Sequence, residues 1–270
     1  MNPAALGARH HEIRHLRALL RDANERRTEG RIVLEGPRLV TDALRRGVAL
    51  EVVYFDIDAK DVILDVAREA MARGIVAREC RPGVLSQAGT TRAPQPLVAI
   101  APAPPIGRVE MLAVAGLGVG PVLVAADVGD PGNLGTLVRS AEAAGAAAVV
   151  CCGETVDVRN PKVVRASAGA LFGIPIVEAV DAVEVLDALA TLGRPSWGAV
   201  AHGGDEYTSV DLTRPGALVV GNEAHGLAAE VAARLERTVT VPMAGRGESL
   251  NVAVAASVML FEAARQRSRL

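Results

Sequence analysis

Three polar, glycine-rich segments in the second half of the sequence each follow a short apolar run. They are Asp127–Gly135 (DVGDPGNLG), Gly221–Leu227 (GNEAHGL) and Pro242–Asn251 (PMAGRGESLN). Loops at the carboxyl ends of parallel strands share one edge of a sheet, and ligands bind there. We therefore expect the three segments to line one crevice.

Each segment carries polar side chains with an ordinary structural explanation. Asn133 and Ser249 are suited to capping the helices that follow them, and Glu223 is suited to accepting N–H groups of the next helix. If Ser249 caps the helix that follows, Asn251 is not needed for capping, and this favours a role for Asn251 in ligand binding. Arg139 lies one to two turns into the helix after Asn133, from where its side chain can point back toward the strand ends.

Several common kinds of site are disfavoured. The glycines of the first segment do not form the dinucleotide fingerprint G-x-G-x-x-G, and no Gly-Lys-Ser/Thr follows as in a phosphate loop. His225 lacks the Ser and Asp of a triad, so we expect an exposed loop histidine. No Cys/His spacing suits zinc, and a solvated face suits the N-terminal histidines 10, 11 and 15 better than a metal site, so no metal is expected.

A fourth segment, Asn160–Gly169 (NPKVVRASAG), begins with a helix signal and carries two cations. Lys162 and Arg165 are expected in the first helical turn, where positive charge opposes the helix dipole. A phosphate partner is slightly favoured over mere surface charge.

The elements around these segments alternate between strands and helices. An amphipathic helix over 9–28 precedes an αβαβαβ pattern that ends at a strand over 97–101, and the proline-rich stretch 101–105 is expected to be a linker. Apolar strands over 122–126, 147–151, 174–177, 197–201, 217–220 and 238–241 follow, with a long helix over 250–267. The fold class is α/β, with domains over 1–104 and 105–270 and a parallel sheet covered on both faces in the second.

Composition agrees with a globular protein. Half of the 270 residues are hydrophobic, 22% are charged and only 2% are aromatic, so the core must be built from Ala, Val, Leu and Ile. With three cysteines, no signal peptide pattern and no apolar stretch long enough for a membrane span, we expect a reduced, soluble, cytoplasmic protein that does not bind membranes.

Taken together, the segments resemble the SpoU branch of the SPOUT RNA methyltransferases over residues 121–265. The matching motifs are Asp127…Asn133-Leu-Gly135…Arg139, Val220-Gly-Asn-Glu223…Gly226-Leu227 and Val241-Pro-Met243…Ser249-Leu-Asn251, and the segment Lys162…Arg165-Ala-Ser167-Ala-Gly169 is similar too. Residues 31–101, with Glu35-Gly-Pro-Arg38 after the first strand, resemble the family's L30e-like substrate-binding domain.

The resemblance implies a trefoil-knotted C-terminal domain, a homodimer, and S-adenosylmethionine as cofactor. The residues expected at the cofactor are Val220, Gly221, Asn222, Val241, Pro242, Met243, Ser249, Leu250 and Asn251. It also implies 2′-O-methylation of a ribose in structured RNA, with 23S rRNA preferred and tRNA as the alternative. RNA contacts are expected at Arg38, Lys162, Arg165 and Ser167.

Methyl transfer from a sulfonium to a ribose hydroxyl is mainly a positioning problem and needs no metal. The resemblance gives Arg139 a part in activating the hydroxyl. Because an arginine is hard to deprotonate, we expect it to clamp the adjacent phosphate rather than to act as a base. Asn133, Glu223, Ser249 and Asn251 would hold Arg139, the loops and the ribose in register.

Two other classes of function stay open from the sequence. A non-catalytic RNA-binding protein would keep the fold and lose the polar side chains, all of which this chain retains. A nicotinamide-dependent oxidoreductase would use a similar sheet, and the missing glycine fingerprint disfavours it.

Overall fold

The computed structural model describes residues 5–89, 94–109 and 118–269, which form two compact units. The first unit comprises residues 1–103 and 159–172, and the second comprises residues 104–158 and 173–270. The first unit therefore contains a segment, 159–172, that lies within the C-terminal domain predicted over 105–270.

The first unit is built on a mixed four-stranded sheet. Its strands are β1 (Arg31–Glu35), β2 (Val52–Asp56), β3 (Val76–Cys80) and β4 (Leu97–Pro102), in the order β1-β4-β2-β3. β4 is antiparallel to β1 and β2, while β2 and β3 are parallel. The helices are α1 (His11–Arg21), α2 (Ala23–Glu29), α3 (Pro37–Arg45), α4 (Asp61–Ala72), α5 (Val84–Ala88), α7 (Pro161–Ala166) and the 3-10 turn η2 (Ala170–Phe172).

The helix expected over 9–28 is in fact two helices. Asp22 has an extended backbone (φ −106°, ψ 118°), and its side chain accepts a hydrogen bond from the Asn24 N–H at 2.8 Å, which starts α2. A side-chain cap therefore overrides the continuous hydrophobic spacing. α1 buries Ile13, Leu16 and Leu19 against the sheet.

The second unit contains an eight-stranded sheet in which every recorded strand pairing is parallel, as the sequence predicted. Its strands are β5 (Ile106–Gly107), β6 (Val122–Ala126), β7 (Ala148–Cys152), β8 (Ile176–Ala179), β9 (Ser196–Ala199), β10 (Asp205–Glu206), β11 (Ala217–Val220) and β12 (Arg237–Thr240). The strand order is β10-β12-β9-β11-β6-β7-β8-β5. The helices are α6 (Pro131–Ala143), α8 (Ala182–Thr191), α9 (Ala229–Ala232) and α10 (Val252–Arg267).

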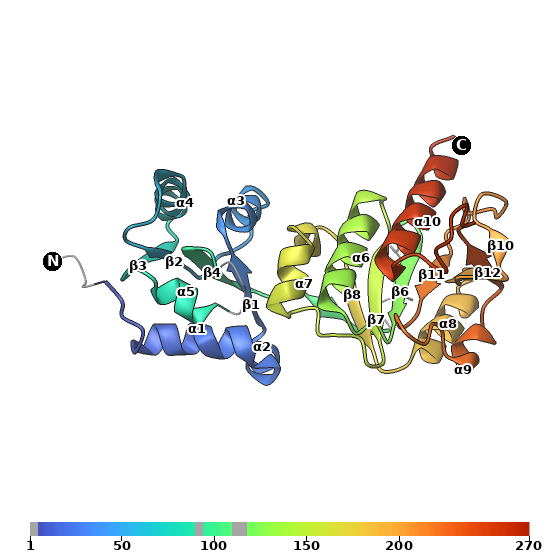
Figure 1. The fold of residues 1–270 in the computed structure, drawn as a ribbon, viewed down its shortest axis with the longest axis horizontal. Helices are drawn as coiled ribbons and strands as arrows, with labels where there is room; N and C mark the ends of the chain where they lie inside the picture. The colour runs from blue at the N-terminus through green and yellow to red at the C-terminus, as the bar shows by residue number, and fades with distance from the viewer. Residues whose placement is uncertain (1–4, 90–93, 110–117, 270) are drawn as a thin grey trace. The chain divides into compact units, whose positions relative to one another are not determined.

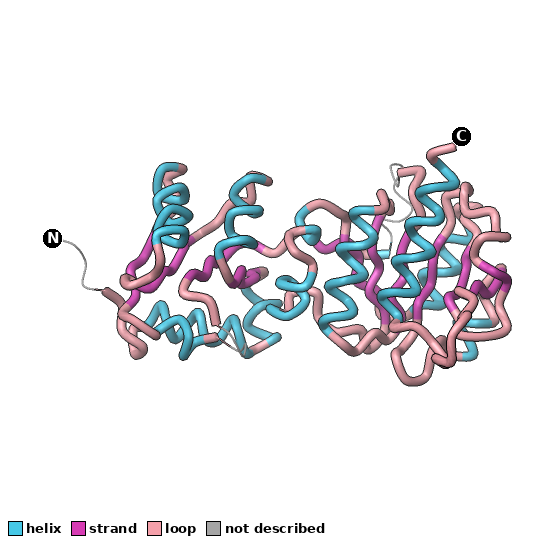
Figure 2. Tube along the Cα trace, turned by 45° about the horizontal axis from the view of Figure 1, so that its top comes forward, coloured by secondary structure: helices cyan, strands magenta, loops and turns pink. Residues whose placement is uncertain are grey.

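Helices cover both faces of this sheet. The connections through α6 and through α8 run in opposite directions along the sheet, so right-handed crossovers place the two helices on opposite faces. Val122 and Val124 of β6 pack in one cluster with Val185 of α8. α10 lies beside α6, where the Ser140 and Ser257 hydroxyl oxygens are 2.6 Å apart (Figures 1 and 2).

The strand order reverses between β6 and β11. From β6 the chain proceeds to β7 and β8 on one side, whereas β11 is followed by β12 on the other. Loops that leave neighbouring strands in opposite directions open a crevice at the carboxyl ends of the strands. The sheet thus fixes where a ligand site can form.

None of the helices in the described part of the chain combines the length and the apolar character that crossing a membrane requires.

Gly216 supports a test of the packing between β9 and β11. A Cβ atom here would lie 2.6 Å from the Pro195 carbonyl oxygen and would overlap the ring of Trp197, which is 2% exposed. We expect Gly216→Ala to lower the free energy of unfolding by about 1–3 kcal/mol through overpacking. Trp197 is the chain's single tryptophan, so its fluorescence in a urea titration measures the change directly. Gly118→Ala, where a Cβ meets nothing within 4 Å, is the control and should leave the midpoint unchanged.

Candidate functional site

A pocket of about 930 Å³ lies at the carboxyl ends of the central strands of the second unit. All three segments singled out in the sequence contribute to it, together with residues 199–201 at the carboxyl end of β9. Its lining includes Asn133 and Asp130 from the first segment, 221–226 from the second, and Met243, Ser249, Leu250 and Asn251 from the third, with Val241 directly before it. The topology therefore brings together stretches that are far apart in the sequence.

The carboxylate of Glu223 joins the loops after β6 and β11. It accepts hydrogen bonds from the backbone N–H groups of Gly129 (3.1 Å) and Asp130 (3.0 Å). It also accepts one from the side-chain amide of Asn133 at 2.9 Å. Glu223 was expected to cap the helix that follows it; instead it binds the N–H groups that lead into α6.

Asn133 extends this contact to α10. Its side-chain oxygen accepts a hydrogen bond from the Asn251 amide at 2.8 Å, and the Asn251 oxygen caps α10 through the Ala253 N–H at 2.9 Å. Both capping expectations were thus wrong. Asp130 caps α6 through the Asn133 N–H at 2.8 Å, and Asn251 rather than Ser249 caps α10.

The hydrogen bonds determine the protonation behaviour of Glu223. Burial by itself would raise the pKa of its carboxyl, but the donors at Asn133, Asp130 and Gly129 outweigh it and hold the pKa below the ordinary value. The ionised carboxylate is therefore the form that the loops bind.

The backbone of the second segment is folded back tightly on itself. The N–H of Asn222 donates to the Gly226 carbonyl and the N–H of Gly226 donates to the Asn222 carbonyl, both at 2.9 Å. A Cβ at Gly221 would overlap the Gly226 carbonyl and lie 2.6 Å from the Leu227 nitrogen, so a side chain has no room at 221. Exposed His225 lies on this turn and lines the pocket.

Asp127 shapes the site, although the sequence predicts nothing for it beyond its place in the first motif. Its backbone is left-handed (φ 59°), its carboxylate accepts the Glu154 N–H at 2.8 Å, and its carbonyl accepts the Asn222 amide at 2.9 Å. Positive φ in a residue other than glycine is uncommon and is sustained only by surrounding contacts. An Asp directly after a buried strand is the only sequence signal for it.

The remaining expected residues are not part of the pocket wall. Val220 is fully buried in β11, and neither it nor Pro242 is among the lining residues. Arg139 is exposed on α6, also outside the lining. In the described part of the chain no side chain or backbone group is paired with Arg139, so its guanidinium is available to a ligand.

Comparison with models of protein families shows which family the chain belongs to. Residues 120–261 match the model of the SpoU rRNA Methylase family, and residues 10–99 match that of an MRM3-like substrate binding domain. The chain belongs to the SpoU rRNA methylase family. The family match covers all three pocket segments.

Relatives and solved structures of this family match nearly the whole chain. A 23S rRNA (uridine(2479)-2′-O)-methyltransferase of Streptomyces viridochromogenes is 32% identical over 98% of this chain and 94% of its own. The 23S rRNA (guanosine(2553)-2′-O)-methyltransferase RlmP of Bacillus subtilis is 32% identical over 90% of this chain and 92% of its own. The crystal structure of the SpoU methyltransferase AviRb from S. viridochromogenes with its cofactor AdoMet aligns with a TM-score of 0.81 at 31% identity, covering 96% of this chain and 99% of that one.

The four residues expected at RNA all belong to the first unit. Arg38 on α3 and Lys162 on α7 are exposed, and Ser167 is buried with its hydroxyl donating to the Val164 carbonyl at 2.8 Å. Arg165 lies in the last turn of the six-residue α7, not in its first turn. Of these two cations, only Lys162 therefore lies in the first helical turn, where its charge opposes the helix dipole.

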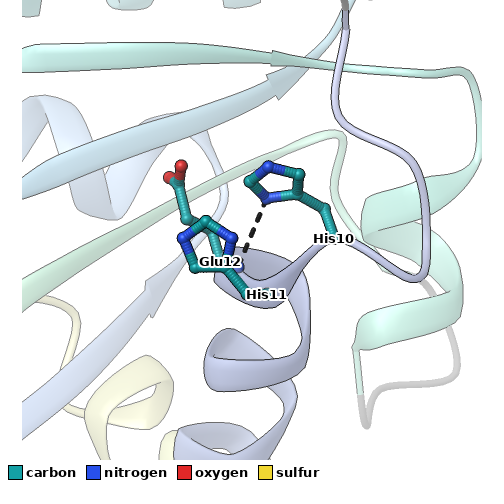
Figure 3. A group of neighbouring side chains, drawn as sticks. All are labelled: His10, His11 and Glu12. Carbon is teal, nitrogen blue, oxygen red and sulfur yellow. Dashed lines mark hydrogen bonds between the residues drawn. The ribbon is translucent and has the colours of Figure 1, made fainter.

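Two groups of potential metal ligands lie in the described part of the first unit, and residues of both groups have other partners. In the group His10, His11 and Glu12 (Figure 3), the His10 Nδ1 accepts the Glu12 N–H at 3.3 Å. That bond leaves the proton on Nε2, which then has no lone pair for a metal. Arg78 lies 3.5 Å from the Glu12 carboxylate, and its charge repels a cation. In the second group, Glu29 is bound by His15 and Arg31.

Glu223→Gln tests the contact between the loops. One carboxylate oxygen becomes an NH₂ group that faces other donors, so we expect the free energy of unfolding at pH 7 to fall by about 1–2 kcal/mol. Because the folded-state pKa of Glu223 is lowered, its stabilisation is present above the unfolded pKa and is lost as the pH falls through the folded value. The difference between wild type and variant should therefore shrink below about pH 4.5. Denaturant titrations at several pH values measure it; Glu248→Gln, on an exposed residue, is the control.

Proposed function

We propose that this chain transfers a methyl group from S-adenosylmethionine to the 2′-oxygen of a ribose in ribosomal RNA. The observation that carries the proposal is the pocket itself, in which the three family motifs meet around the linked side chains of Asn133, Glu223 and Asn251. Its membership of the SpoU rRNA methylase family and the 2′-O-methyltransferase activity named for two relatives support it.

The pocket suits the proposed methyl donor. Its volume lies within the range of small-molecule sites, and its wall combines the apolar side chains of Val241, Met243 and Leu250 with polar Ser249 and residues 221–226. A flat base and a thioether-like chain need apolar walls, and the polar ends of such a molecule need hydrogen-bonding groups. We place the cofactor against Val220–Asn222, Val241–Met243 and Ser249–Asn251. When bound, it supplies a methyl group already activated by a sulfonium.

The residues of the chain have positioning and electrostatic tasks. In the reaction the carbon–sulfur bond breaks as the carbon–oxygen bond forms, and the proton of the hydroxyl leaves to solvent. Arg139, unpaired in the described structure, binds the phosphate next to the reacting ribose and stabilises the negative charge that develops on its oxygen. Glu223 and Asn133 hold the start of α6, the helix that carries Arg139, and Asn251 ties it to α10. Ser249 lies in the pocket wall and contacts the cofactor there.

Arg139→Ala tests this assignment. We expect methyl transfer to fall about 10²–10³-fold because the developing charge loses its partner. Binding of S-adenosylmethionine, measured by calorimetry, should stay unchanged, since Arg139 does not line the pocket. Arg68→Ala, at an exposed residue of α4, is the matched control. Full activity of Arg139→Ala would remove it from the mechanism.

Labelled methyl transfer to purified rRNA and tRNA tests the function as a whole. We expect 2′-O-methylation of 23S rRNA, and mapping of ribose methylation then identifies the nucleotide. Transfer to tRNA but not to rRNA would show that tRNA, rather than 23S rRNA, is the substrate. Absence both of transfer and of heat on addition of S-adenosylmethionine would favour a non-catalytic RNA-binding protein.

The two units have separate tasks in this proposal. The N-terminal domain, residues 1–104, binds the RNA, with Arg38 and the α7 residues Lys162 and Arg165 as phosphate contacts, and Ser167 fixes the end of α7. The match of residues 10–99 to a substrate binding domain supports this division. The methyltransferase domain, residues 105–270, performs the transfer without a metal. Because its proposed substrate is ribosomal RNA, we assign the protein to the cytoplasm.

We further propose a trefoil knot and a homodimer. The segment 241–251 lines the same pocket as 199–201 and 221–226, which supports a path of the chain through the loop between those stretches. On α10, Val254 and Phe261 are 46% and 51% exposed and lie two turns apart, so the helix presents an apolar stripe beside α6. Such a stripe favours burial against a second copy.

Phe261→Glu tests the dimer. A charge in the apolar stripe should separate the two copies, and light scattering after gel filtration should show the mass falling from twice to once 27.9 kDa. Val180→Glu is the control, because Val180 is 89% exposed and lies in the loop between β8 and α8, not on α10. A wild-type protein that elutes as a monomer would contradict the proposal.

A further inference from the structure

Glu35, the last residue of β1, is a buried carboxylate whose hydrogen-bonding capacity is not filled. Its side chain is only 4% exposed, and in the part of the chain that is described its Oε1 atom has no hydrogen-bond partner. Burial raises the pKa of Glu35, and the nearby Arg165 opposes this. A charge kept in such a place costs folding free energy, and groups of this kind concentrate at functional sites.

The one charged neighbour of Glu35 among the recorded ion pairs comes from the segment 159–172. The Arg165 guanidinium lies 3.8 Å from the Glu35 Oε2 atom. This segment follows β7 and precedes β8 in sequence, yet it packs in the first unit, where α7 contacts β1. Gly169 (φ 87°) lies so close to Asp42 of α3 that a Cβ there would overlap the carboxylate. The segment is thus seated on β1 and α3.

Arg165 has its other side in solvent. Its side chain is 42% exposed while that of its partner is almost fully buried. Two further cations flank the pair in sequence: Arg38 three residues after Glu35, and Lys162 one helical turn before Arg165; both are exposed. A guanidinium carries five donors in a planar fork, so it can face a carboxylate on one edge and a phosphate on the other.

We propose that Glu35 is a positioning residue that holds the Arg165 guanidinium at the surface of the first unit, where it binds a backbone phosphate of the substrate RNA. The inference deepens the proposed function and rests on it for the identity of the RNA. It makes the phosphate site a product of two distant stretches of the chain, one of which lies within the residues that match the methylase model.

Charge alone predicts the opposite effect of removing Glu35. Loss of a negative charge beside a phosphate site should tighten RNA binding. If the carboxylate positions Arg165, its loss should weaken binding instead. The sign of the change therefore separates positioning from general electrostatics.

The test measures binding of deproteinised 23S rRNA at several salt concentrations, without methyl donor. We expect Arg165→Ala to weaken binding about tenfold and to reduce the salt slope by about one. Glu35→Gln should weaken binding three- to tenfold, and adding it to Arg165→Ala should weaken it no further. Arg165→Lys should restore part of the affinity. The exposed pair Asp65 and Arg68 on α4 is the matched control, and Asp65→Asn should leave binding equal or tighter.

Binding by Glu35→Gln as tight as or tighter than wild type would overturn the proposal, as would additive effects in the double variant. In methyl transfer, Glu35→Gln should raise KM for RNA while kcat stays within twofold. Its melting temperature at pH 7 should equal or exceed that of wild type, because a buried charge is removed. A lowered melting temperature with a lowered kcat would show that Glu35 serves only the fold. Wild-type protein that binds this RNA but transfers no methyl group would refute the function and leave the binding test intact.

Discussion

The contact that organises the second unit is the carboxylate of Glu223 between the loops after β6 and β11. These strands are neighbours in the sheet, although the residues that the carboxylate joins are 94 positions apart. Their loops diverge at the reversal of strand order, which would leave the N–H groups before α6 without partners. Glu223 binds two of them, and Asn133 and Asn251 extend the link to α10. The pocket wall and the helix that bears Arg139 are thereby fixed together.

Small residues make this arrangement possible. Close approach of the backbone at Gly221 and Gly226 lets the second loop fold back on itself, and Gly153 lies against the Asp127 carboxylate where a Cβ has no room. The sheet core is built from Val, Ala and Leu, in keeping with an aromatic content of 2%. Rigid loops around a pocket are what a reaction limited by alignment requires.

Glu35 and Glu223 show how surroundings give one side-chain type two behaviours. Glu35 ends β1, and Glu223 lies three residues after the end of β11; a glycine follows each of these strands. Glu223 is partly open to solvent and saturated with donors, so its pKa is lowered and its charge stabilises the fold. Glu35 is buried with one oxygen unpartnered, so its pKa is raised and its charge is a cost. The first carboxylate is explained by the architecture, whereas the second calls for a function.

The sequence by itself determined the strand and helix order, the parallel sheet and the three loops of the pocket, because apolar runs, periodicity and glycines act locally. It identified Asn133, Glu223 and Asn251 but misassigned their partners. A cap can be filled by Asp130 or Asn133, and by Ser249 or Asn251, and only the spatial meeting of loops selects between them. The left-handed backbone of Asp127 and the packing of 159–172 on β1 were likewise decided by tertiary structure. Each depends on a contact between residues that no local pattern connects.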